Sequence, residues 1–262
     1  MLNYNSIKMN LFIFFIHLLK PFYLQQKIYR FEKALRYYVK MITKSTLNYT
    51  DNTSFVYPDI THKPWHESDE NDTLKFVSQI LENGYTDIAD EWFNYLHSGY
   101  NIIPRLKPSE IFGESFKNKD EDWKYYVIWR HGKFTEVGLS LFPRTGKFIS
   151  QLNCFLYSFG EVVFIVMKPG VVLPSHIDNL NISLTCQLGI TIPKDCGIKV
   201  GGETRSWTRG KTLFFENSFE HEAWNQSQED RVVLLLDLYH PELTNVEKAL
   251  LDVMLKHLNF TG

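Results

Sequence analysis

The strongest constraint on the fold of this chain is a series of short strand-like segments in its second half. From residue 123 onward, apolar and aromatic runs alternate with turns rich in Gly, Pro, Asn and Asp. This spacing is typical of antiparallel sandwiches and barrels, in which each strand is short and the chain soon turns back. The runs are residues 123–130, 153–158, 161–167, 171–176, 182–192, 197–200, 203–207, 211–215, 221–224 and 231–239. We therefore predict a mainly β jelly roll with flanking helices.

Helices are expected on both sides of this strand region. Residues 72–81 and 87–97 each begin with an Asp that suits an N-terminal cap. A third helix is predicted over residues 244–258, where Thr244 and Glu247 have the spacing of a capping box. All three carry an apolar stripe or caps without chemical motifs, so we expect them to be structural.

A polar stretch divides the chain into two parts. Residues 43–71 are rich in Ser, Thr, Asn and Asp and read as an extended connector. We therefore predict an N-terminal helical segment and connector over residues 1–54, and one main domain with a C-terminal helix over residues 55–262.

The N-terminal segment contains an apolar run, MNLFIFFIHLLKPFYL at residues 9–24, and an amphipathic helical pattern at residues 27–42. A helix that spans a bilayer needs about 20 apolar residues, so the run is short for that role. An uncleaved signal anchor, a helix in the membrane interface and a helix packed on the domain all agree with this pattern. The expected location is therefore membrane-associated through residues 9–24, or otherwise cytoplasmic.

Charge and cysteine content exclude several classes of partner. Lys and Arg number 28 against 30 Asp and Glu, for a net charge of -2, so no global attraction to nucleic acid is expected. Cys154, Cys186 and Cys196 lack the C-x-x-C spacing of a zinc site. They are interpreted as buried small apolar residues, and a bridge between Cys186 and Cys196 is left open.

The main chemical signal is a set of metal-ligand residues in the strand region. His176 and Asp178 form an H-x-D pair and, in an extended strand, project to the same side. His221 opens a later strand that could lie alongside. Two imidazoles and one carboxylate on one face of an octahedron are the ligands of non-haem ferrous iron. The structural alternative is that His221 caps a strand and Asp178 belongs to an Asx turn with Asn179.

Arg231 is the second chemical signal, because it precedes the apolar run VVLLLDL of a strand expected to be central. Its guanidinium could bind a carboxylate through two parallel hydrogen bonds, and beside iron that carboxylate would suit a dicarboxylate cosubstrate. A surface ion pair with Glu229 or Asp230 is the alternative. His240 is interpreted as a structural histidine at a strand end. No role is assigned to His62, His66, His97, His131 and His257.

Together, these segments resemble the aspartyl/asparaginyl β-hydroxylase family of Fe(II)- and 2-oxoglutarate-dependent dioxygenases, and are similar to bacterial lipid A hydroxylases of the same superfamily. The resemblance covers residues 58–246. The matching motifs are MKPG (167–170), HIDNLN (176–181), LGITIP (188–193), ETRSWTRGK (203–211), FENSFEHEAWN (215–225) and RVVLLLDLYHPELT (231–244).

The resemblance implies a cupin-like double-stranded β-helix in which His176 and His221 hold Fe(II) and Arg231 binds the far carboxylate of 2-oxoglutarate. Animal peptidyl hydroxylases have glycine at the position of Asp178, whereas other members carry H-x-D. Because Asp178 is present here, a complete triad of protein ligands is expected. The implied reaction uses O2 to hydroxylate a C–H bond of a peptide, protein or lipid substrate.

Several positions depart from the peptidyl hydroxylases in ways that bear on cosubstrate and substrate. Gln187 replaces a histidine and Ile165 a serine that contact 2-oxoglutarate, while Thr185 and Ser183 replace basic substrate-binding positions. Gln187 is expected to contact the cosubstrate without a positive charge. Trp123 is a further candidate for the wall of the cosubstrate pocket.

Two alternatives follow from these departures. One is a lipid A-type hydroxylase of membrane lipids, favoured by the apolar N-terminal run and the missing substrate-binding basic residues. The other is a non-catalytic jelly-roll protein that binds metal but no longer turns over 2-oxoglutarate.

Overall fold

The computed structural model describes residues 28–36, 56–98, 109, 112–178 and 180–257. The chain forms two compact units. One comprises residues 63–178 and 183–241, and the other comprises residues 1–62, 179–182 and 242–262. The β region and all candidate site residues lie in the first unit.

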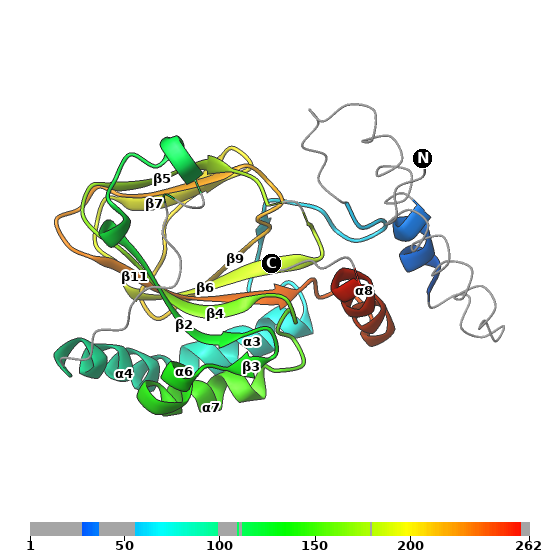
Figure 1. Ribbon diagram of the computed structural model, residues 1–262, viewed down its shortest axis with the longest axis horizontal. Helices are drawn as coiled ribbons and strands as arrows, with labels where there is room; N and C mark the ends of the chain where they lie inside the picture. Colours follow the sequence, from blue (N-terminus) through cyan, green and yellow to red (C-terminus); the bar gives the residue numbers. More distant parts are fainter. Residues whose placement is uncertain (1–27, 37–55, 99–108, 110–111, 179, 258–262) are drawn as a thin grey trace. The chain divides into compact units, whose positions relative to one another are not determined.

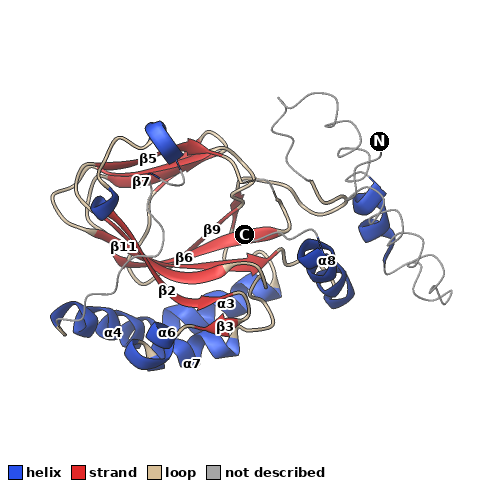
Figure 2. Cartoon of the chain, viewed as in Figure 1, coloured by secondary structure: helices blue, strands red, loops and turns tan. Residues whose placement is uncertain are grey.

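The first unit is built on two antiparallel sheets (Figure 1). The seven-stranded sheet has the order β1 (Trp65–His66), β9 (Thr212–Phe215), β6 (Ser183–Thr191), β11 (Arg231–Tyr239), β4 (Glu161–Met167), β2 (Trp123–Arg130) and β3 (Lys133–Phe134). The four-stranded sheet has the order β5 (Val171–His176), β10 (His221–Asn225), β7 (Cys196–Val200) and β8 (Glu203–Arg205). Figure 2 shows the two sheets in red as facing layers. The predicted jelly roll with flanking helices is confirmed.

Side chains alternate between two cores because successive residues of a strand point to opposite faces. On the outer face of the large sheet, Phe164 of β4 packs against Trp92 and Phe142, with ring centroids 4.8 and 5.0 Å away. Its neighbour Ile165 instead joins the core between the sheets, with Ala223 of β10. The residues of β6 and β11 whose side chains lie in the layer between the sheets are therefore the ones available to a site there.

Four helices cover the outer face of the large sheet (Figure 1), α3 (Asp72–Asn83), α4 (Tyr85–His97), α6 (Glu136–Leu141) and α7 (Pro143–Gln151). Asn71 rather than Asp72 caps α3, because its side chain accepts a hydrogen bond from the Leu74 N–H at 3.0 Å. The turn between α3 and α4 requires glycine at position 84, since a Cβ there would lie 2.8 Å from the ring of Phe148. Short 3-10 turns precede β2 at Gly113–Ser115 and Asp120–Asp122.

One predicted strand is wrong. Residues 153–158 follow α7 as turns, and only Leu156 makes an isolated bridge, with Leu238. Leu152 and Leu156 both pack into the outer core. The apolar residues that suggested a strand therefore belong to the turns that follow α7.

The second unit contains a helical stretch at residues 28–36 and α8 (Asn245–His257). The predicted capping box is confirmed, because the Thr244 N–H donates to Glu247 at 2.8 Å and the Glu247 N–H donates to the Thr244 hydroxyl at 3.2 Å. Glu247 is buried and also accepts hydrogen bonds from Arg30 and from the Tyr57 hydroxyl, so one carboxylate ties three segments together.

The prediction of membrane association is corrected. Among the described residues, no helix is long and apolar enough to cross a membrane. Residues 9–24, on which that prediction rested, lie outside the described part of the chain. Cys186 and Cys196 are both buried free thiols, on opposite sides of the large sheet, so the bridge that was left open does not form.

Candidate functional site

His176 and His221 are brought side by side on the four-stranded sheet. They end β5 and begin β10, and they are direct partners in the antiparallel register. Their ring centroids are 4.0 Å apart. His221 is buried and shares a face of β10 with Ala223, which packs between the sheets, whereas His176 is half-buried. Strand pairing thus brings together two residues that lie 45 positions apart in the sequence.

Hydrogen bonds fix the same tautomer in both imidazoles. The Nδ1 atom of His176 lies 2.8 Å from the carbonyl oxygen of Pro174, and that of His221 lies 2.9 Å from the carbonyl oxygen of Phe219. Because a carbonyl can only accept, each Nδ1 must carry the proton. Each Nε2 therefore presents a lone pair, which is the form that binds a metal ion.

The surroundings of His221 favour its neutral form. Burial, followed by the nearby ring of His176, lowers the pKa of His221 below its usual value. A neutral imidazole does not have to lose a proton before it binds a cation. This environment therefore suits metal ligation and opposes a role for His221 as a charged hydrogen-bond donor.

Asp178 is two residues from His176 in the sequence, but its side chain contacts Asn217. Its side chain is exposed and accepts a hydrogen bond from the Asn217 side chain at 2.8 Å, while its N–H donates to the Asn217 carbonyl at 2.9 Å. The Asp178 carboxylate is thus held by the loop that leads into His221. The structure places His176 and His221 side by side and the Asp178 carboxylate against Asn217, so a complete triad of His176, Asp178 and His221 stays a prediction.

Arg231 lies at the start of β11 and is only 2% exposed. Its guanidinium carbon is 4.5 Å from the centre of the Trp207 ring, and one terminal nitrogen lies 3.4 Å from the sulfur of Met167. Among the described residues, no carboxylate forms an ion pair with it, and its buried Nε has no hydrogen-bond partner. The surface ion pair with Glu229 or Asp230 is therefore not formed.

A buried arginine without a carboxylate carries an uncompensated charge. Burial lowers the pKa of Arg231 to about 10, so the guanidinium is still charged at neutral pH. A cation in this setting is a binding site for an anionic group that can satisfy its free N–H groups.

Gln187 and Trp123 line the same layer from β6 and β2, two strands of the large sheet that β11 and β4 separate. Gln187 of β6 is buried, and its side-chain oxygen accepts a hydrogen bond from the Trp207 indole at 2.7 Å. Trp207 thereby joins Gln187 to Arg231, a link that the sequence reasoning missed although the tryptophan lies within the ETRSWTRGK motif. It was missed because a strand pattern does not show which loop residue covers the end of a sheet.

Trp123 lies between Arg231 and the histidines. Its Cα pairs with that of Met167, which pairs in turn with Arg231, so the three stand in a row across β2, β4 and β11. Phe112 lies 5.8 Å from the Trp123 ring and 4.9 Å from the His176 ring. The predicted residues thus occupy one connected layer.

A second group of ligand-type side chains was missed by the sequence reasoning. His66, Glu216 and His240 are all buried, and one potential ligand atom from each lies within 4.8 Å of the others. Within the described part of the chain, these His and Glu side chains come close enough together to hold one metal ion. His66 had no assigned role and His240 was interpreted as structural, since 150 residues separate His66 from Glu216.

Comparison with known proteins shows the family to which the chain belongs. The family model described as Aspartyl/Asparaginyl beta-hydroxylase matches residues 82–241. The chain is 30% identical over 182 residues to the aspartyl/asparaginyl beta-hydroxylase of Mus musculus, a match that covers 66% of this chain and 24% of the relative. It is 37% identical over 203 residues to the Mus musculus aspartate beta-hydroxylase domain-containing protein 2, covering 76% of this chain and 57% of that protein.

Among solved structures, a Pseudomonas putida prolyl-4-hydroxylase aligns with 61% of this chain and 87% of its own, at 14% identity and a TM-score of 0.39. This chain spans between about a quarter and just over half of the length of the two curated relatives. The family model nevertheless matches more than half of the chain and contains His176, Asp178, His221 and Arg231. The chain belongs to the aspartyl/asparaginyl β-hydroxylase family.

Proposed function

We propose that this protein is an Fe(II)- and 2-oxoglutarate-dependent dioxygenase that hydroxylates a C–H bond of a peptide or related substrate. The observation that carries the proposal is the buried guanidinium of Arg231, which has no carboxylate partner among the described residues. It lies in the same connected layer as two histidines whose Nδ1 atoms are held by backbone carbonyls, which leaves each Nε2 atom for a metal ion. A dicarboxylate that spans from a metal ion to a cation matches both features.

The residues present fit ferrous iron. His176 and His221 would supply two nitrogen ligands, with their Nδ1–H groups held by backbone carbonyls as in many metal sites. Asp178 would complete a two-histidine, one-carboxylate set. When bound, iron and 2-oxoglutarate supply the activation of O2 and the oxidation of the C–H bond.

Arg231 would bind the far carboxylate of 2-oxoglutarate. Its Nε is buried without a hydrogen-bond partner, so a bound carboxylate would satisfy a donor that is now unsatisfied, which strengthens recognition. The ring face of Trp207 would hold the guanidinium in place. Gln187 would in turn hold Trp207, by accepting a hydrogen bond from its indole N–H. Ile165 on β4 offers only apolar contact, so we expect Arg231 to dominate cosubstrate affinity.

The substrate side of the layer is neutral. Ser183 and Thr185 of β6 are both buried and uncharged. A substrate carboxylate would lack a cationic partner at these two positions. We therefore propose that the substrate group nearest to them is neutral, such as an amide or an apolar side chain, and that a peptidyl aspartate is a poor substrate.

The test is succinate formation from 2-oxoglutarate with Fe(II) and ascorbate under air. We expect turnover in the wild type, loss in His221→Ala and loss in Arg231→Ala. His97→Ala on the exposed end of α4 is the matched control and should behave as wild type. Mass spectrometry of peptide libraries should then find products that have gained one oxygen atom. Equal succinate formation in the wild type and in both site variants would refute the proposal and leave a non-catalytic metal-binding protein.

A further inference from the structure

We propose that His66, Glu216 and His240 form a second, buried binding site for a divalent transition-metal ion, with Zn²⁺ as the best chemical match. Each side chain comes from a different part of the large sheet: His66 from β1, Glu216 from the residue after β9 and His240 from the residue after β11. Two imidazoles and a carboxylate are a common ligand set for zinc. The site shares no residue with the one proposed for iron.

Burial is the first argument. His66 is 2% exposed, and Glu216 and His240 are fully buried. An ionised carboxylate in such a place is costly unless cations or hydrogen bonds compensate it. The Lys63 N–H and the Ser218 hydroxyl donate to the two oxygens of Glu216 at 3.0 and 3.2 Å, so fixed donors already hold this carboxyl group in place.

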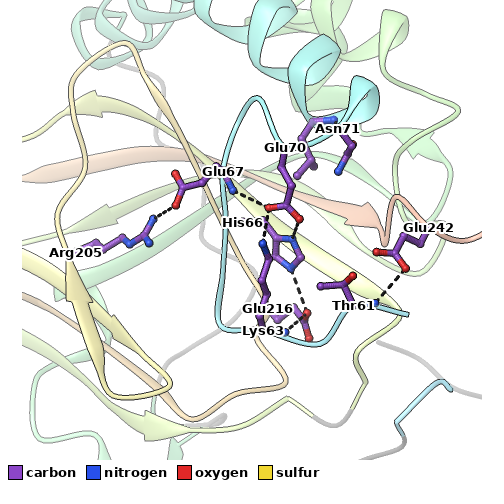
Figure 3. A network of polar contacts seen from close by, with 10 residues as sticks. Thr61, Lys63, His66, Glu67, Glu70, Asn71, Arg205, Glu216 and Glu242 are labelled. Carbon is purple, nitrogen blue, oxygen red and sulfur yellow. Dashed lines mark hydrogen bonds and ion pairs between the residues drawn. The ribbon is translucent and has the colours of Figure 1, made fainter. Parts of the chain in front are cut away.

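The contacts of His66 are the second argument (Figure 3). Its Nδ1 lies 3.2 Å from one oxygen of Glu70, and its Nε2 lies 3.2 Å from one oxygen of Glu216. A neutral imidazole can donate from only one nitrogen. If Nδ1 donates to Glu70, the Nε2 lone pair faces a carboxylate oxygen, and a cation between them turns this repulsion into ligation.

The remaining geometry fits this arrangement. Two ligands at about 2.0–2.1 Å from a tetrahedral zinc ion are about 3.4 Å apart, close to the separation of 3.2 Å between His66 Nε2 and Glu216. Glu70 would be the carboxylate that orients a metal-bound histidine through its other nitrogen. The Lys63 ammonium already forms an ion pair of 2.7 Å with the Glu70 carboxylate. Figure 3 labels Lys63 beside Glu216.

His240 distinguishes a metal site from a simple ion pair. An imidazolium at His66 could bridge Glu70 and Glu216 without any third group. The ring centroid of His240 lies 5.8 Å from that of His66, and its ligand atom lies within 4.8 Å of the other two. His240 therefore brings a second imidazole to the same point, and the three groups together supply the three protein ligands of a zinc site that keeps its fourth position open.

The experiment uses the full chain carrying His221→Ala, so that the site proposed for iron does not contribute to binding. Protein stripped with a chelator is titrated with Zn²⁺ alone, and bound metal is counted by elemental mass spectrometry. We expect one zinc per chain, a zinc-dependent rise in melting temperature and an X-ray absorption spectrum with two imidazole ligands. These readouts do not depend on enzyme activity, so failure of the proposed function would leave them unchanged.

Variants then assign the zinc to this cluster. Adding Glu216→Gln, which keeps the size of the side chain, should weaken zinc binding at least a hundredfold, whereas adding His97→Ala should leave it unchanged. Glu70→Gln should weaken it by about 10–100-fold without removing a ligand, and serves if Glu216→Gln does not fold. Absence of bound zinc in the His221→Ala protein, or unchanged affinity in both glutamate variants, would overturn the proposal. His66 would then be an imidazolium that bridges two carboxylates.

Discussion

The two histidine clusters of this protein differ in how they are built and in how exposed they are. His176 and His221 face each other across paired strands of the small sheet, and His176 is half-buried, with the exposed Asp178 close by in sequence. His66 and His240 meet Glu216 in a closed environment at the end of the large sheet. Sites that react with substrates keep open positions, whereas structural metal sites are closed by protein ligands. We therefore propose a reactive metal at the first cluster and a structural metal at the second.

The largest effect that separates the clusters is expected for His221→Ala. If this pair holds the reactive metal, succinate formation should fall by about a thousandfold or more, because a metal ligand acts as one unit with the rest of the site. The free energy of unfolding of the metal-free protein should fall by only about 1 kcal/mol, because the substitution removes the hydrogen bond from Nδ1 to the Phe219 carbonyl but no group that the fold pairs with Nε2. Parallel assays of turnover and urea unfolding check this, with His97→Ala as the control. A variant that loses stability and activity together would place His221 among structural residues.

Glu216→Ala should show the opposite pattern. Removing this carboxylate leaves the Lys63 N–H and the Ser218 hydroxyl without an acceptor in a buried place, so the free energy of unfolding should fall by about 2–4 kcal/mol. Urea denaturation beside the exposed-site control Glu121→Ala measures the change. A loss below about 0.5 kcal/mol, the range of ordinary surface substitutions, would show that the second cluster does not stabilise the fold.

The contrast between the clusters also explains what could be predicted from sequence. His176 ends one strand and His221 opens another that is marked by its own turn, so the sequence predicts that each lies at a strand end, while the fold pairs the two strands. Strand alternation likewise places Arg231 and Gln187 in the layer between the sheets. In each case a physical rule that acts over a few residues decides the geometry.

The second cluster obeys no such local rule. His66 lies in a strand of only two residues, and its neighbours in the cluster are set by the order β1, β9, β6, β11 of the large sheet. Strand order depends on tertiary packing that single-sequence periodicity does not encode. The same limit explains the unpredicted contact of Trp207 with Arg231 and the false strand at residues 153–158, where apolar residues pack against a sheet without pairing in it.

A change in stability that depends on pH is expected from the substitution Asp237→Asn on β11. Asp237 is an acidic residue that, unlike Glu216, is not clustered with histidines, so it shows what burial alone does to a carboxyl group. Burial raises its pKa from 3.8 to about 7, so the folded state binds a proton more tightly than the unfolded state does. Stability should therefore fall as pH rises between about 4 and 7, and the charged form should cost about 4 kcal/mol above that range. Asp237→Asn can still accept the Glu161 N–H and should remove this cost.

The measurement for Asp237 is the difference in unfolding free energy between Asp237→Asn and the wild type at pH 5 and pH 8. Taking the difference cancels the opposite trend from His221, whose lowered pKa makes the wild type gain stability as pH rises through its usual range. The variant should be more stable than the wild type at pH 8, and the advantage should shrink at pH 5. An equal difference at both values would mean that Asp237 is charged throughout.

The smallest effect tests whether Asp178 belongs with the two histidines. Asn217 holds the exposed Asp178 carboxylate at 2.8 Å, so Asn217→Ala should leave the free energy of unfolding within about 0.5 kcal/mol of wild type. If Asp178 is a third iron ligand, losing the group that orients it should weaken Fe(II) affinity by about tenfold. Competitive metal titration measures this, beside Asp178→Gly, which removes the carboxylate altogether. Equal iron affinity in both variants and the wild type would mean that the two histidines hold the metal without Asp178. The contrast between the clusters would then sharpen further, because the open site would use fewer protein ligands than the closed one.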